Sequence, residues 1–249
     1  MRHLVLISLA IALSGAVAVG PSAAGARTSK PIVDAKRPAA DIARDVSRKP
    51  AEILAFARVK RGDTVLDFIM GGGYWTRLLA TAVGPRGRVL AYQPAEFIAF
   101  RAAYGTEQDA AVKGVANAVP LRIKLAEFAI DTTPDVILTV QNWHDLYLKM
   151  APADSGARMA QALFHALKPG GTFVVVDHAA AADAPREVAD TLHRIDPARA
   201  RKDIEAAGFV FDGELPIYRN PSDPRTTLVF DPLIRGKTDQ FVYRFRKPR

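Results

Sequence analysis

Two pairs of histidine and aspartate follow two apolar segments of this 249-residue sequence, and their side chains suit proton transfer. His144 and Asp145 come shortly after segment 135–140, whereas Asp177 and His178 end segment 172–177. An imidazole acts as a general base on an oxygen or carbon acid when a carboxylate fixes its tautomer. We therefore expect catalytic roles for His144, Asp145 and His178, with Asp145 orienting His144. A structural role stays open, because neighbours in sequence need not bring their side chains into contact.

The same imidazoles and carboxylates are also of the types that bind divalent metals. Their spacing matches no metal-binding motif, and we expect a shared polar wall and no metal. The chain contains no cysteine, which excludes thiolate ligands and disulfide bonds.

A glycine turn is the second chemical feature, because residues 65–76 are Val-Leu-Asp-Phe-Ile-Met-Gly-Gly-Gly-Tyr-Trp-Thr. A strand that delivers Asp67 to a glycine turn, with a helix beginning near Tyr74, is an arrangement that holds nucleotide-like ligands. Asp67 is expected to contact the ligand or to order the loop; the alternative is that it only caps backbone N–H groups. Of Tyr74 and Trp75, we expect one in the pocket wall and the other in the core.

Alternating strands and helices must position these residues. We expect five strands at 64–69, 88–92, 121–125, 135–140 and 172–177, each followed by helical segments, and then strands near 209–215, 227–230 and 240–245. This order predicts an α/β fold with a parallel sheet, helices on both faces and an antiparallel C-terminal edge. Ligands of such sheets bind at the carboxyl ends of the strands.

The N-terminus has the pattern of an export signal, with Arg2 and His3 before an apolar stretch that ends in small residues. We expect a signal peptide at 1–26 with cleavage after Ala26, a linker at 27–36 and one domain at 37–249. The mature protein would then be periplasmic or secreted, without a stable membrane anchor; an uncleaved anchor is the alternative. The net charge of +8 is scattered without basic runs, so we expect no nucleic-acid partner.

These residues carry a resemblance to the class I S-adenosylmethionine-dependent methyltransferases, and more narrowly to a group of exported bacterial "predicted methyltransferases". It covers the chain from about Arg48 to the C-terminus. The motifs are Gly71-Gly-Gly-Tyr-Trp-Thr76, Gln141-Asn-Trp-His-Asp145, Leu167-Lys-Pro-Gly-Gly171, Val176-Asp-His178, His193-Arg-Ile-Asp196 and residues 230–239. The resemblance implies a Rossmann-like, seven-stranded, mostly parallel sheet and S-adenosylmethionine as cofactor. The residues it assigns to cofactor binding are Asp67, Gly71, Gly72, Gly73, Tyr74, Trp75, Gln93 and Asn142.

The sequence departs from the family pattern at two positions. Ile69 stands where the family turn has its first glycine, and a branched side chain there would crowd a ligand. Gln93 stands where the family has an acidic residue that accepts hydrogen bonds from both ribose hydroxyls; Glu96 is a substitute within reach. In addition, residues 141–144 are not the Asn/Asp-Pro-Pro-aromatic motif of amino-methylating enzymes, so methylation of bases or protein amines is not indicated.

The resemblance implies methyl transfer to an unidentified small-molecule or envelope acceptor. A non-catalytic periplasmic binding module on the same fold is the alternative. A nicotinamide-dependent oxidoreductase is a weaker third reading, because the turn lacks Gly-x-Gly-x-x-Gly spacing. In the motif at 193–196, His193 or Arg194 could line the substrate side, and Asp196 is expected to cap the following helix.

Overall fold

The computed structural model describes residues 37–249 of the chain. The expected signal peptide at 1–26, its cleavage after Ala26 and the linker at 27–36 lie outside the described residues and stay predictions. No helix within residues 37–249 is long and apolar enough to cross a membrane.

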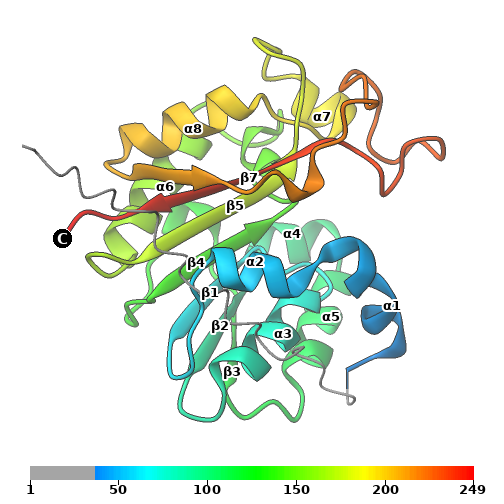
Figure 1. The fold of residues 1–249 in the computed structure, drawn as a ribbon. Helices are drawn as coiled ribbons and strands as arrows, with labels where there is room; N and C mark the ends of the chain where they lie inside the picture. The colour runs from blue at the N-terminus through cyan, green and yellow to red at the C-terminus, as the bar shows by residue number, and fades with distance from the viewer. Residues whose placement is uncertain (1–36) are drawn as a thin grey trace, which may run out of the picture. The chain divides into compact units, whose positions relative to one another are not determined.

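A seven-stranded sheet forms the centre of the described part (Figure 1). Its strands are β1 (Thr64–Phe68), β2 (Arg88–Tyr92), β3 (Ala118–Leu121), β4 (Val136–Val140), β5 (Thr172–His178), β6 (Val210–Glu214) and β7 (Gln240–Arg246), in the order β3-β2-β1-β4-β5-β7-β6. β1 to β5 pair in parallel, whereas β7 runs antiparallel to both β5 and β6. The predicted mostly parallel sheet with an antiparallel C-terminal edge is confirmed.

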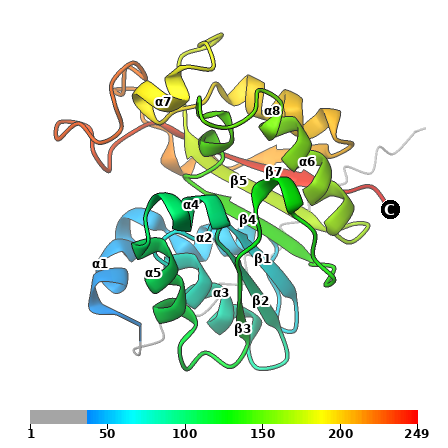
Figure 2. The same ribbon diagram turned by 180° about the vertical axis from the view of Figure 1, so that it is seen from behind.

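Helices cover both faces of the sheet (Figures 1 and 2). They are α1 (Ala39–Arg48), α2 (Pro50–Phe56), α3 (Tyr74–Val83), α4 (Ala95–Phe100), α5 (Ala103–Val112), α6 (Ser155–Ala166), α7 (Val188–Leu192) and α8 (Pro197–Ala206). Short 3-10 turns are η1 (Leu125–Glu127), η2 (His144–Tyr147) and η3 (Pro216–Tyr218). Side chains alternate along each strand, so Val65 and Val174 pack with α2 and α3, whereas Leu66 and Phe173 pack with α6 and α8.

The structure corrects two of the expected strands. The third strand is 118–121, earlier than the expected 121–125. Segment 227–230 is no strand, because its polar groups are satisfied elsewhere: Val229 N–H donates to the carbonyl of Leu192, and Arg194 donates to the carbonyl of Thr227. Arg194 is fully buried and pairs with Asp223 at 2.8 Å. Side-chain contacts therefore hold this segment, where we expected the backbone hydrogen bonds of a strand.

The strand order reverses between β1 and β4, and this is where the fold positions a site. β2 and β3 lie on one side of β1, whereas β4 and β5 lie on the other. The loops after β1 and β4 therefore diverge to opposite faces and leave a crevice at the carboxyl ends of the two strands. The predicted functional residues follow these strand ends.

Candidate active site

A cavity of about 300 Å³ lies at the carboxyl ends of β1 and β4. The turn after β1 and the loop after β4 form its floor, and α1 and the segment before β7 contribute to its walls. Most of the predicted site residues line it, namely Asp67, Gly71, Gly72, Tyr74, Trp75, Asn142, His144, Asp145 and His178. Residues separated by more than a hundred positions are thus brought to one hollow.

Two predicted cofactor residues do not line this cavity. Gln93 is fully buried, and its Oε1 accepts a hydrogen bond from Gly71 N–H at 3.1 Å, so it supports the glycine turn from behind. Gly73 directly precedes α3 with φ +79°, and a Cβ there would lie 2.3 Å from Cβ of Ala111. Gly73 therefore permits α3 to pack against α5. Both residues were expected at the ligand, and both act on the architecture of the turn.

The turn after β1 contains Ile69 in the left-handed region, with φ 59°. A β-branched residue is an outlier there, because its Cβ crowds the backbone. Ile69 is nevertheless 2% exposed and belongs to the main core cluster. Asn142 holds the turn from the other side, since its Nδ2 donates to the carbonyl of Ile69 at 2.7 Å and to that of Val140 at 2.8 Å. Asn142 thus ties the ends of β1 and β4 together.

Asp67 lies at the base of the cavity and is almost fully buried. Its Oδ2 accepts a hydrogen bond from Thr76 Oγ1 at 2.6 Å. Burial raises the pKa of Asp67 to about 7, although the hydrogen bond from Thr76 opposes this shift. A positively charged ligand group in the cavity would favour the ionised carboxylate.

His144 is held by Asp177, where we had expected Asp145. Asp177 Oδ1 lies 2.8 Å from His144 Nδ1, and its Oδ2 accepts the backbone N–H of His144 at 2.7 Å. This contact places the proton on Nδ1 and directs Nε2 away from Asp177. Nε2 lies 3.3 Å from Asp145 Oδ1 and 3.3 Å from His193 Nδ1. The His/Asp side chains predicted at two strand ends therefore meet, with Asp177 as the orienting group.

The protonation of this cluster follows from its burial and charges. Burial alone lowers the pKa of His144, but the carboxylates of Asp177 and Asp145 outweigh it and raise the pKa to about 9. Burial raises the pKa of Asp145 to about 6, against the influence of His144. Burial lowers the pKa of His178 to about 4. Nδ1 of this ring lies 2.7 Å from Thr238 Oγ1. At neutral pH, Nε2 of His144 thus carries a proton that must leave before the ring can act as a base.

Comparison with known proteins supports the architecture. No family model matches the chain, and no curated protein matches it. Among solved structures, an S-adenosylmethionine-dependent methyltransferase from Aquifex aeolicus aligns with TM-score 0.56 at 19% identity, over 82% of this chain and 92% of the other. The N-methyltransferase NodS from Bradyrhizobium japonicum aligns with TM-score 0.55 at 12% identity, over 83% of this chain and 97% of the other.

The chain has the class I methyltransferase fold. At these identities the comparison establishes the arrangement of strands and helices, so the chemistry must be argued from this chain's own side chains.

A second chamber of about 400 Å³ adjoins the first in this methyltransferase fold and shares part of its wall, including Trp75 and His178. Three arginines line it, Arg44 and Arg48 from α1 and Arg235 from the segment before β7, and no carboxylate does. Arg48 is half-buried, and its guanidinium donates to Gln141 Oε1 at 3.2 Å. Within residues 37–249 it forms no salt bridge, and burial lowers its pKa to about 10.

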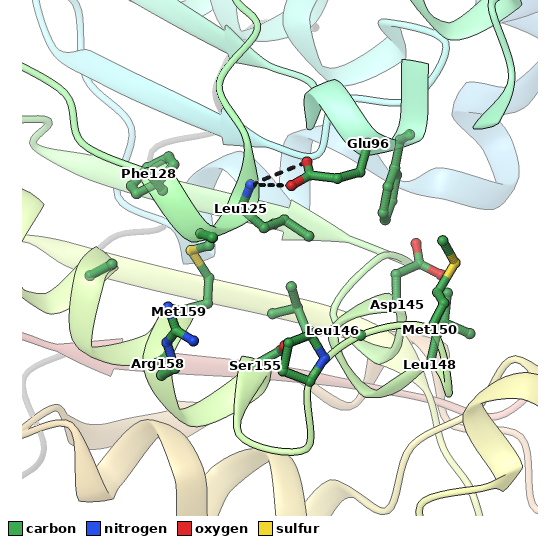
Figure 3. Close-up of a pocket in the computed structure, with 15 residues that line it drawn as sticks. Glu96, Leu125, Phe128, Asp145, Leu146, Leu148, Met150, Ser155, Arg158 and Met159 are labelled. Carbon is green, nitrogen blue, oxygen red and sulfur yellow. Dashed lines mark hydrogen bonds between the residues drawn. The ribbon is translucent and has the colours of Figure 1, made fainter. Parts of the chain in front are cut away.

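An apolar pocket of about 220 Å³ lies on the other side of Asp145 (Figure 3). It is walled by Phe97 of α4, Leu125 of η1 and Met159 of α6. Glu96, the expected substitute for Gln93, lies at its edge, and its carboxylate accepts Leu125 N–H at 3.0 and 3.2 Å. Asp145 lines this pocket and the first cavity alike.

Sequence reasoning missed several residues of the site. The arginines of α1 were not singled out, although the spacing of Arg44 and Arg48 places both on one face of a helix. Phe230 lies against His193, with ring centroids 4.8 Å apart, from a segment that we expected to be a strand. Asp196 does cap α8 as predicted, since its side chain accepts Ala198 N–H.

Proposed function

We propose that this protein transfers a methyl group from S-adenosylmethionine to a small-molecule acceptor that carries an aromatic ring and an anionic group. The observation that carries the proposal is the arrangement of two adjoining chambers at the strand-order reversal of a methyltransferase fold. One chamber is bounded by the glycine turn and Asp67, and the other by arginines and aromatic rings. The two share Trp75 and His178, as donor and acceptor sites must adjoin for a group to pass between them.

The cavity fits the cofactor in several respects. Gly71 lines it with no heavy atom within 4 Å of a Cβ position, so the backbone leaves room for a ligand. Trp75 lines the same cavity and provides aromatic surface for a ligand. Asp67 and Gly71 would hold the charged amino-acid end, and Phe97 and Leu125 would hold the apolar base. When bound, S-adenosylmethionine supplies a methyl group activated by its positive sulfur.

The acceptor chamber favours an anion because three arginines line it without a carboxylate. Among the described residues, the half-buried guanidinium of Arg48 donates to the neutral amide of Gln141 and to no carboxylate. A ligand carboxylate or phosphate would supply a charged partner. Trp75, Tyr218 and Phe230 provide aromatic surface in the same chamber. The chain's part in the reaction is to align the acceptor, to exclude water and to hold its proton-accepting groups at the boundary between the chambers.

A calorimetric titration with S-adenosylmethionine and S-adenosylhomocysteine tests the cofactor site. Gly71→Val should weaken both ligands at least about tenfold, because the new side chain projects into the open cavity. Gly114→Val is the matched control: Gly114 also has a positive φ, +74°, and no heavy atom within 4 Å of a Cβ position, but it lies outside the cavity. Equal losses in both variants would contradict the assigned site.

A panel of hydroxylated aromatic acids and their uncharged amides tests the acceptor class. We expect methylation of the acids only, and Arg48→Gln should raise their KM about ten- to a hundredfold, the value of a charge-assisted hydrogen bond. Arg58→Gln is the control, since Arg58 pairs with Asp212 outside both chambers. Methylation of amides and acids at equal rates would refute the role of the arginines.

A non-catalytic binding module is the second candidate, favoured by Ile69 and Gln93 at positions where the family has glycine and an acid. Tight binding of the cofactor without methyl transfer to any panel member would support it. Activity in the periplasm or outside the cell is likewise a proposal, and N-terminal sequencing of the mature protein for cleavage after Ala26 tests it.

A further inference from the structure

Three donor atoms from different parts of the chain converge at one corner of the first cavity. They belong to His144, Asp145 and His193, and all three lie within 4.8 Å of one another. His144 Nε2 is 3.3 Å from His193 Nδ1 and 3.3 Å from Asp145 Oδ1. No sequence motif predicts this set, because His193 reaches His144 only through the fold.

The spacing of these atoms is that of ligands around a metal ion. Nitrogen and oxygen ligands lie about 2.0–2.2 Å from Zn²⁺, so two ligands of one ion are about 3.0–3.5 Å apart at octahedral or tetrahedral angles. Two of the three pairs already have such a separation. A small approach of Asp145 to His193 would complete the triangle.

The surroundings of His144 prepare its Nε2 for a metal. Asp177 is fully buried and bonds Nδ1 of the ring, so Nε2 is the nitrogen that faces the cluster, and a metal would displace the proton that Nε2 carries at neutral pH. A histidine that gives its other N–H to a carboxylate is the usual outer-shell arrangement of metal sites. Asp177 is itself fixed, because it also accepts the backbone N–H groups of His144 at 2.7 Å and His178 at 2.7 Å.

His193 has a backbone conformation that is uncommon for residues other than glycine. It ends α7 in the left-handed region with φ 51°, where glycine or asparagine is preferred. The ring of Phe230 lies 4.8 Å away on one side and the ring of His144 5.4 Å away on another, so the imidazole is confined with Nδ1 toward the cluster. The backbone conformation and the two neighbouring rings therefore fix the position of the imidazole.

We propose that His144, Asp145 and His193 bind a divalent transition metal, for which Zn²⁺ is the suited probe. Two imidazoles and one carboxylate provide three protein ligands, and all three residues line the cavity. A fourth position would therefore face the cavity and accept an oxygen of a small molecule, as in catalytic zinc sites. This inference does not depend on the cofactor, since the donors belong to the chain alone.

The test is a calorimetric titration of tag-free, chelator-treated protein with zinc sulfate, followed by X-ray absorption at the zinc edge. We expect one Zn²⁺ per chain at micromolar or tighter affinity, with imidazole nitrogen at about 2.0–2.1 Å. His193→Asn should lower the affinity at least about tenfold, and asparagine tolerates the left-handed backbone, so the fold is kept. Asp177→Asn should lower it about ten- to a hundredfold through the orientation of His144.

His165→Asn is the matched control, because His165 is exposed on α6 and outside the cluster. It should bind Zn²⁺ as the unchanged protein does. Absence of binding at millimolar zinc would overturn the proposal, as would an absorption spectrum without imidazole ligands. An affinity that falls equally in His165→Asn and His193→Asn would also overturn it, since the metal would then sit elsewhere.

Discussion

Ile69 gives a prediction in which two substitutions reverse their usual order of stability. Ile69→Ala and Ile69→Gly both remove a side chain that is 2% exposed, at a cost of about 2–5 kcal/mol. Alanine retains a Cβ at φ 59°, which costs about 1–2 kcal/mol, whereas glycine does not. Glycine loses more chain entropy on folding, about 0.5–1 kcal/mol. Ile69→Gly should therefore be more stable than Ile69→Ala by up to about 1.5 kcal/mol.

The control is Ile137 in the middle of β4, which is fully buried in extended backbone. There the alanine variant should be more stable than the glycine variant by about 0.5–1 kcal/mol. Urea unfolding of the four variants gives the free energies, and the difference between the two positions is then the left-handed penalty itself, about 1–2 kcal/mol. If alanine is the more stable residue at both positions by the same margin, Ile69 is not strained and the reasoning fails.

Two further predictions concern buried charge. Burial raises the pKa of Asp67 from 3.8 to about 7, so the folded protein loses stability as the pH rises through this window, by up to about 4 kcal/mol. Asp67→Asn should remove that loss. In urea unfolding, the free energy of unfolding of the variant should therefore rise relative to that of the unchanged protein between pH 5 and pH 8, and an equal difference at both pH values would contradict this. Arg194→Met should destabilise by about 3–5 kcal/mol, because it leaves Asp223 buried and unpaired, whereas the exposed pair Arg201–Glu205 should give Arg201→Met less than about 1 kcal/mol in the same assay. A loss as small for Arg194→Met as for Arg201→Met would refute the anchoring role of the buried pair.

The architecture and the location of the site were predictable from local patterns. Apolar runs such as 172–177 mark buried parallel strands, and parallel strands place their carboxyl ends at one edge. That rule alone was enough to place Asp67, His144 and His178 around one cavity. The residues at strand ends are thus the part of a site that sequence predicts best.

Contacts made by loops and distant helices were not predictable in the same way. The path of the loop after β4 decides whether Asp145 or Asp177 contacts His144 Nδ1. Proximity in sequence favoured Asp145, but the contact is made by Asp177. His193 and Arg48 reach the site from a helix end and from the N-terminal helix, whose positions are set by packing over the sheet. The resemblance to the family assigns Gln93 to the ligand. In the structure, its side-chain oxygen instead accepts a hydrogen bond from Gly71 N–H behind the turn.

Backbone strain supports a retained ligand site in this cavity. Of the seven residues other than glycine with positive φ within residues 37–249, three line the cavity: Ile69, Gln141 and His193. Each such conformation costs of order 1–3 kcal/mol, which is a substantial share of the 5–15 kcal/mol that typically stabilises a domain. A fold that had lost its ligand would gain stability from glycine or asparagine at these positions without any loss of function. Three such positions around one hollow therefore support the ligand site that we propose, in preference to a fold kept only as a scaffold.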